Sequence, residues 1–180
     1  MIKISRPIQK GVYLRHRLFE KLDDLRHLPV IWLSAPAGAG KTTLVSSFIE
    51  NRRIPCLWYQ IDKGDEDLAS FFYYMGQAIM KAAPRNRKPM SLLTPEYSQG
   101  IPTFTMRYFE ELHRRLKVPS FLVFDNYQEV SADSPFHEMI ESAISRIPAG
   151  MTMVVMSRSD PPSLFIRLKA DSYILKKIVL

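Results

Sequence analysis

Short, uninterrupted apolar runs alternate along the chain with longer stretches in which apolar residues recur every three to four positions. The runs predict strands that are buried on both faces, at residues 29–34, 56–61, 120–125, 151–156 and 173–180. The longer stretches predict amphipathic helices, at residues 42–51, 64–79, 103–116 and 134–147. This alternation indicates a three-layer α/β fold, in which helices cover both faces of a parallel five-stranded sheet.

Turn and cap residues support the boundaries of these elements. Acidic residues at 65–67 lie where the positive end of a helix dipole favours them. Ser134 and Pro135 suit the cap and the first position of the helix that follows. Residues 82–102 contain four prolines and predict an irregular connection. The chain stops within its last strand-like run, so we expect a longer protein that is truncated here after the fifth strand.

The composition is that of an ordinary globular domain. The chain has 180 residues, of which 46% are hydrophobic and 24% are charged, and this argues against disorder, collagen and coiled coils. No apolar run approaches the ~20 residues of a membrane helix and no signal peptide is visible, so we expect a cytoplasmic protein that has no membrane partner. The single cysteine, Cys56, excludes an intrachain disulfide and a cysteine-clustered zinc site.

The formal net charge of +7 leaves two interpretations open. Residues 1–17 carry five basic residues and no acidic one, and a second basic stretch comprises Lys81, Arg85, Arg87 and Lys88. Such stretches occur in nucleic-acid-binding proteins, but they are also common on solvated tails and loops.

Residues 35–42, APAGAGKT, match the phosphate-loop pattern, except that Ala35 replaces the usual first glycine. Small residues let successive backbone N–H groups turn inward around phosphate oxygens, and the following helix contributes its positive end. The Lys41 side chain can reach the β- and γ-phosphates, and the Thr42 hydroxyl can ligate Mg²⁺. The loop follows a predicted strand and opens a predicted helix, which is the context that this chemistry needs.

Asp125 ends the apolar strand 120–125 and is the second candidate for the site. Ligands of open parallel sheets bind at the carboxyl ends of the strands. A carboxylate there can hold Mg²⁺ opposite Thr42, so we expect both residues to be metal ligands.

The residues after these strands bear on catalysis. Asn126 follows Asp125, where many ATPases carry an acid that deprotonates water, and an amide cannot act as that base. Glu129 is a possible substitute, and we expect slow hydrolysis. Arg158 follows the strand 151–156, from which it could contact the γ-phosphate or remain a surface residue.

The order of strands narrows the class of nucleotide-binding protein. One full strand lies between the phosphate loop and the Asp125 strand along the chain. This fits the P-loop NTPases in which an additional strand is inserted between the loop strand and the acid strand, a feature that simple nucleotide kinases and GTPases usually lack.

Five segments together resemble the ATPase domain of MalT-type, LuxR-family regulators, which are signal-transduction ATPases with numerous domains (the STAND class). In chain order the segments are 14–18 (LRHRL), 34–43 (SAPAGAGKTT), 58–62 (WYQID), 124–128 (FDNYQ) and 157–162 (SRSDPP). The resemblance covers nearly the whole chain. It implies an ATP-dependent transcriptional activator that switches between resting ADP-bound and active ATP-bound states, using Mg²⁺.

The resemblance also implies roles for residues and domains. Residues 1–28 would pack near the nucleotide, and residues 29–180 would form the NTPase core. DNA and the inducer would bind domains outside this chain, self-association would accompany the ATP state, and the isolated core would bind nucleotide weakly. The nucleotide would be held by Arg15, Ala37, Gly38, Ala39, Gly40, Lys41, Thr42 and Thr43.

Two other functions remain open from the sequence. A small-molecule phosphotransferase could use the same loop, but it would need an acceptor-binding region and an arginine-rich lid, for which Arg85 and Arg87 are the available residues. A non-catalytic interaction or DNA-binding module could retain the loop for structural reasons. Helical spacing assigns Phe71 and Phe72 to the core, and Tyr73 and Tyr74 could contact further domains.

Overall fold

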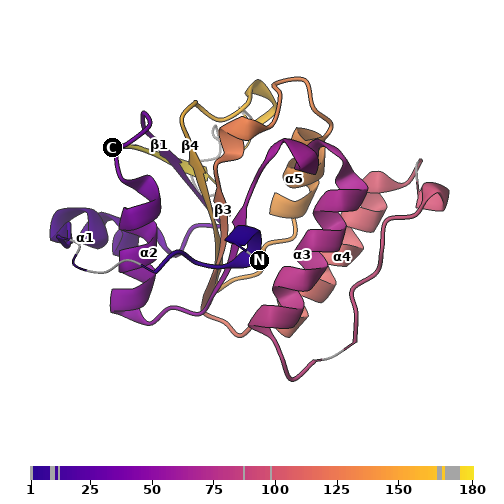
Figure 1. Ribbon diagram of the computed structural model, residues 1–180, viewed down its shortest axis with the longest axis horizontal. Coiled ribbons are helices and arrows are strands. Elements are labelled where there is room, and N and C mark those ends of the chain that lie inside the picture. Colours follow the sequence, from indigo (N-terminus) through magenta and orange to yellow (C-terminus); the bar gives the residue numbers. More distant parts are fainter. Residues whose placement is uncertain are drawn as a thin grey trace.

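A five-stranded parallel sheet forms the middle layer of the protein in the computed structural model (Figure 1). The structure describes residues 2–8, 11, 13–86, 88–97, 99–165, 168 and 175–180. The strands are β1 (Val30–Ser34), β2 (Cys56–Gln60), β3 (Ser120–Asp125), β4 (Met151–Ser157) and β5 (Leu175–Val179), in the spatial order β2-β3-β4-β1-β5. Every described pairing is parallel, which confirms the predicted sheet.

The inserted strand is β4, which lies between β1 and β3. The order of strands along the chain had pointed to the strand at 56–61, because it comes between the phosphate loop and Asp125. In the sheet, however, this strand (β2) lies at the edge and pairs only with β3 among the described strands. The register aligns Ser34 with Ser157 and Gln60 with Asp125, so the strands end together at one edge of the sheet. That edge carries the candidate site.

Helices cover both faces of the sheet (Figure 1). The helices α1 (His16–Leu25) and α2 (Lys41–Arg52) lie on one face, and α3 (Leu68–Ala82), α4 (Ile101–Arg115) and α5 (Phe136–Ile144) lie on the other. Short 3₁₀ turns occupy Ile2–Ile4 (η1), Lys63–Glu66 (η2), Pro95–Tyr97 (η3), Tyr127–Glu129 (η4) and Ser163–Phe165 (η5). The three-layer α/β prediction is therefore confirmed.

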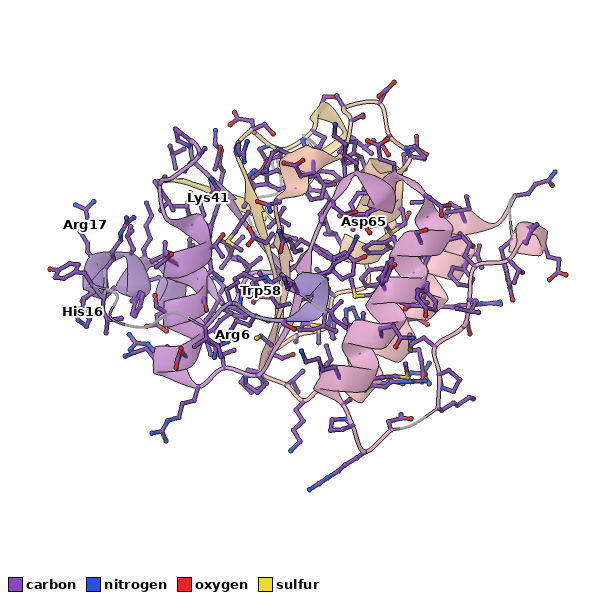
Figure 2. All side chains as sticks on the ribbon, viewed as in Figure 1. Arg6, His16, Arg17, Lys41, Trp58 and Asp65 are labelled. Atoms are coloured by element: carbon purple, nitrogen blue, oxygen red, sulfur yellow. The ribbon has the colours of Figure 1, made fainter. Side chains whose placement is uncertain are left out.

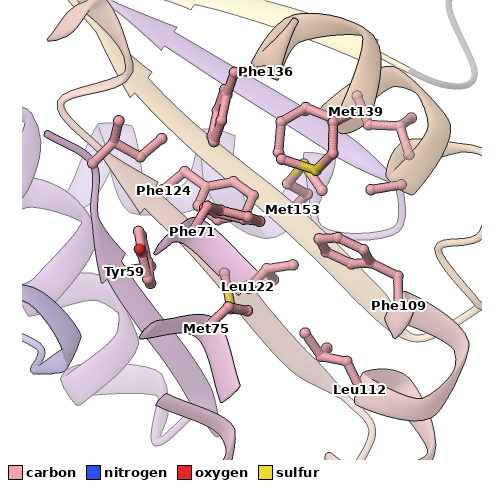
Figure 3. Close-up of a cluster of buried hydrophobic side chains, with 14 of the residues drawn as sticks. Tyr59, Phe71, Met75, Phe109, Leu112, Leu122, Phe124, Phe136, Met139 and Met153 are labelled. Carbon is pink, nitrogen blue, oxygen red and sulfur yellow. The ribbon is translucent and has the colours of Figure 1, made fainter. Parts of the chain in front are cut away.

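Two hydrophobic cores explain why the strands are apolar without interruption. On β3, Leu122 and Phe124 face α3, α4 and α5, whereas Phe121 and Val123 face α1 and α2. Figure 3 shows the first of these cores, in which the Phe71 ring of α3 lies against β2, β3 and α5. Its centroid is 5.0 Å from that of Phe136, in the edge-to-face arrangement that aromatic pairs favour.

Some boundaries differ from the sequence predictions. The helix α1 was not predicted, although Phe19 and Leu22 give it a buried stripe. The predicted helix 64–79 is a 3₁₀ turn followed by α3, since Asp67 caps the helix through the N–H groups of Ala69 and Ser70. The helix α5 ends at Ile144 and not at residue 147, with Pro135 at its N-cap. Residues 173 and 174, predicted as strand, lie outside the described residues.

The N-terminal residues are fastened to the sheet and to α2. Lys3 pairs with Asp62 at 2.7 Å and with the fully buried Asp65 at 2.9 Å. The Arg6 guanidinium donates to the Ser46 carbonyl of α2 at 2.8 Å. Residues 2–6 therefore contact β2 and α2, whereas residues 13–15 lie nearer the loop after β1.

No helix among the described residues is long and apolar enough to cross a membrane.

Candidate functional site

The loop between β1 and α2 has the backbone of an anion cradle. Gly38 and Gly40 have φ angles of +79° and +81°, a region that residues with a side chain rarely adopt. Gly40 is the N-cap of α2 and contributes no side chain, so the first N–H groups of the helix have no side-chain cap. Ala35 is buried and extends β1, because its N–H donates to the Ser157 carbonyl at 3.2 Å. Its backbone needs no positive φ, which explains why alanine can replace the usual glycine.

Lys41 lies at the start of α2 (Figure 2), and its side chain folds back over this loop. Its ammonium group donates to the carbonyls of Ala35 at 2.6 Å and Pro36 at 3.1 Å. Burial lowers the pKa of Lys41, the nearby Arg158 lowers it further, and Asp125 raises it. Lys41 therefore lies within electrostatic reach of both Arg158 and Asp125, although the three residues come from different segments.

Thr42 and Asp125 meet beneath the loop. The Thr42 hydroxyl donates to Oδ2 of Asp125 at 2.9 Å, and the Asn126 N–H donates to Oδ1 at 3.0 Å. Asp125 is only 4% exposed, and burial raises the pKa of its carboxyl in spite of these two donors. A hydroxyl and a carboxylate are hard oxygen donors of the kind that Mg²⁺ accepts, so the residues present fit this ion.

Gln128 joins the two strand ends beyond the loop, and the sequence pattern had assigned it no role. Its amide group donates to Oδ1 of Asn126 at 3.4 Å and to Oε1 of Glu129 at 3.2 Å, and its carbonyl accepts the Arg158 N–H at 3.1 Å. Ser159 next to Arg158 is held in turn, since its carbonyl accepts from Trp32 and Ser34 of β1. The Arg158 side chain is exposed on this fixed backbone.

Arg15 lies against the other side of the loop. Its guanidinium donates to the Ala39 carbonyl at 3.1 Å and lies 3.2 Å from where a Cβ on Gly40 would stand. A cavity of about 320 Å³ opens here, lined by Tyr13, Arg15, Gly40, Thr43, Leu44 and Ser47. The residues expected to hold a nucleotide are thus gathered at one edge of the sheet, whereas His16 and Arg17 point outward on α1 (Figure 2).

Comparison with solved structures supports the fold. The chain is similar to a Signal Transduction ATPase with Numerous Domains (STAND) protein with a tetratricopeptide repeat sensor from Pyrococcus horikoshii, with a TM-score of 0.60 and 16% sequence identity. The match covers 98% of this chain and 24% of that chain, so the present chain spans about a quarter of the length of that protein.

A family model identifies the chain more directly than the structural match does. The model is described as Nephrocystin 3, N-terminal, and its match at residues 12–158 includes the phosphate loop, Asp125 and Arg158. The chain therefore belongs to the Nephrocystin 3, N-terminal family.

Proposed function

We propose that this chain is a STAND-class nucleotide-binding switch domain that binds ATP and ADP with Mg²⁺. The hydrogen bond between Thr42 and Asp125, beneath a loop with two left-handed glycines, is the observation that carries the proposal. The family and the similar fold support it.

Each group has a distinct role in this proposal. The N–H groups of residues 37–40 and of the first turn of α2 bind the phosphates. Lys41 exchanges two backbone carbonyls for phosphate oxygens, which are stronger acceptors. Thr42 and Asp125 hold Mg²⁺, which neutralises phosphate charge when it is bound.

The nucleoside occupies the cavity between the N-terminal segment and α2, where Arg15 and Thr43 line the wall. Arg158 senses the γ-phosphate from the end of β4. Of the N-terminal segment 1–28, residues 13–15 then belong to the nucleotide site, and residues 29–180 supply the core.

Hydrolysis at this site is slow because no carboxylate directly follows Asp125. Asn126 can orient a water molecule but cannot accept its proton. Glu129 is the nearest candidate base, since its carboxylate and the Asn126 amide contact the same Gln128 side chain. A slow ATPase suits a switch that signals through its bound nucleotide.

Calorimetric titration of Mg·ATP and Mg·ADP into the wild-type chain and the Lys41→Ala variant tests the proposal. We expect binding to the wild type and a loss of at least about tenfold in affinity in the variant. Lys63→Ala is the matched control, because Lys63 is exposed and follows β2, three strands away from β1. Equal binding by wild type and Lys41→Ala would contradict the proposal.

The finer role that we propose is that of a MalT-type, LuxR-family transcriptional regulator acting in the cytoplasm. DNA and inducer binding would lie outside residues 1–180, and the ATP state would self-associate. Light scattering of the chain with Mg²⁺ and a non-hydrolysable ATP analogue should then give a larger mass than with ADP. An identical mass in both states would remove the support for nucleotide-controlled assembly.

A phosphotransferase is the second candidate, because a cavity of about 740 Å³ lies beside the site. Its lining includes Gln128, His137, Ser159 and Asp160. An acceptor bound there would be close to Arg158, whereas Arg85, the candidate lid residue, lies at the opposite edge of the sheet. Transfer of labelled γ-phosphate to a small molecule, in place of release as inorganic phosphate, would favour this function.

A further inference from the structure

A basic cavity lies at the edge of the sheet opposite the candidate nucleotide site. It is bounded by the C-terminal ends of α3 and α4 and by the first residues of β2 and β3, at the lower end of the molecule in Figure 1. Its volume is about 530 Å³, within the range of small-ligand pockets. The fold here brings the basic stretch at 81–88 next to a second one at 114–117, which is distant in sequence.

The charges that line this cavity are all positive. Arg85, Arg114, Arg115 and Lys117 line it, and no acidic residue does so among the described residues. Glu111 neutralises part of this charge, since it pairs with Arg114 at 3.3 Å and with Arg115 at 2.8 Å. Arg85 and Lys117 form no ion pair with any residue that the structure describes. Glu111 carries a single negative charge against these four cations, so a net charge of about +3 remains to attract an anion.

The helix dipole explains the presence of only some of these basic residues. Basic residues in the last turn of a helix are stabilised by its dipole, and Arg114 and Arg115 lie in the last turn of α4. Arg85 lies three residues beyond the end of α3, and Lys117 lies two residues beyond the end of α4. The dipole effect falls off within the last turn, so it does not account for these two residues.

The lining of the cavity includes two buried polar side chains, Ser120 and Arg115. Ser120 lines the cavity and is 2% exposed, and its hydroxyl has no hydrogen-bond partner among the described residues. The Arg115 side chain is also 2% exposed and is held by Glu111 and by the Lys88 carbonyl. A buried hydroxyl that lacks a partner is unfavourable unless a ligand or water supplies one.

We propose that this cavity binds a small organic phosphate. Arg85 and Lys117 supply the charge, Asn86 and Ser120 supply hydrogen bonds, and Pro55 and Leu116 contribute apolar walls for the organic part. A concave site with apolar walls and a fixed arginine suits a small ligand better than a polymer, which is bound along an extended basic surface. The proposal is independent of the nucleotide function.

Amide chemical shifts of the ¹⁵N-labelled chain test this assignment, with inorganic phosphate and ribose 5-phosphate as probes. We expect saturable shifts at residues 85, 86, 117 and 120, with a Kd below about 1 mM for ribose 5-phosphate. The double variant Arg85→Gln/Lys117→Gln should weaken this binding by at least about tenfold. Arg107→Gln is the matched control, because Arg107 is exposed on α4 but does not line the cavity.

The location of the shifts separates the possible outcomes. Shifts confined to residues 36–42, unsaturable shifts at basic residues in general, or an equal loss in Arg107→Gln would each overturn the proposal. Tighter binding of duplex DNA, with shifts that extend to Arg107 and the N-terminal basic residues, would also overturn it in favour of a nucleic-acid surface. The calorimetric titration with Mg·ATP tests the nucleotide site separately.

Discussion

Replacing Asp125 with asparagine should stabilise the protein while abolishing magnesium-dependent nucleotide binding. Asp125 is 4% exposed, and its carboxylate receives hydrogen bonds from the Thr42 hydroxyl at 2.9 Å and from the Asn126 N–H at 3.0 Å. Asparagine has the same shape and can keep both contacts, because its oxygen accepts from Asn126 and its amide donates to the Thr42 oxygen. The variant therefore loses a buried charge, and the Thr42 hydroxyl changes from donor to acceptor; because Thr42 is partly exposed, water can accept the proton that it frees.

The size of the gain follows from the burial and the two hydrogen bonds. Burying a carboxylate costs several kcal/mol even after the protein relaxes. Hydrogen bonds to a charged acceptor return about 1.5–3 kcal/mol each, so the two donors offset most of that cost. We expect the free energy of unfolding of Asp125→Asn to exceed that of the wild type by about 1 kcal/mol at pH 7. For a chain of this length that is a rise in Tm of about 2–4 °C.

The gain should depend on pH with a defined sign. Burial raises the pKa of Asp125 above the 3.8 of an unperturbed carboxyl. The unfolded chain releases this proton first, so the wild type loses stability as the pH rises from about 3.8 through the folded-state pKa. Asparagine does not titrate, and the difference between variant and wild type should therefore be small in acid and reach its full value at neutral pH.

Asp65→Asn is the matched control, with the opposite expected sign. The Asp65 carboxylate is fully buried and receives the Tyr59 hydroxyl at 2.6 Å, the Asp62 N–H at 2.9 Å and the Lys3 ammonium at 2.9 Å. An asparagine oxygen there can keep the Asp62 N–H and Lys3, but its amide then faces the Tyr59 hydroxyl. Tyr59 is fully buried, so its hydroxyl proton loses its acceptor, and Lys3 loses one of its two carboxylate partners. We expect a loss of about 2–3 kcal/mol.

Urea unfolding gives the free energies for both variants, and calorimetry with Mg·ATP gives the binding. A destabilised Asp125→Asn that still binds Mg·ATP with wild-type affinity would refute the reasoning, because the carboxylate would then be a structural partner of Thr42.

Three further predictions follow from single positions. Gly40→Ala should lower the free energy of unfolding by about 1–2 kcal/mol and weaken nucleotide binding, because alanine would have to adopt a φ of +81° with its Cβ 3.2 Å from Arg15. The control Gly100→Ala, at a φ of −122°, should be nearly neutral, and urea unfolding measures both. Asn126→Asp should raise the rate of ATP hydrolysis by at least about tenfold in a phosphate-release assay, because it adds a general base. Burial lowers the pKa of His113 to about 4. The free energy of unfolding of the wild type should therefore fall by up to about 3 kcal/mol as the pH falls from 6.5 to 4, and acid-unfolding curves of His113→Leu should lack this fall.

The fold was predictable from the sequence because its strands are uninterrupted apolar runs. β3 is buried on both faces, so every position from Phe121 to Phe124 is apolar, and the polar Asp125 marks the edge of the sheet. The loop at residues 35–42 was equally accessible, since its geometry depends on local residues such as Gly38 and Gly40.

Features that depend on contacts across the chain could not be predicted in the same way. Helix α1 was missed because only Phe19 and Leu22 are buried in a mostly polar segment. Gln128 was assigned no role because its partner Arg158 is 30 residues away and meets it only when β3 and β4 pair. The cavity lined by Arg85 and Lys117 likewise exists only after α3 and α4 pack side by side.

The fold does not require an asparagine at position 126. Asn126 has a φ of +61°, which turns the chain from β3 into the next 3₁₀ turn, and both asparagine and aspartate tolerate this left-handed region. The Gln128 amide that donates to the Asn126 oxygen could donate equally to a carboxylate at that position. Neither the turn nor the hydrogen bond therefore selects an amide over an acid. The slow hydrolysis that we propose is then caused by the Asn126 side chain and not by the fold.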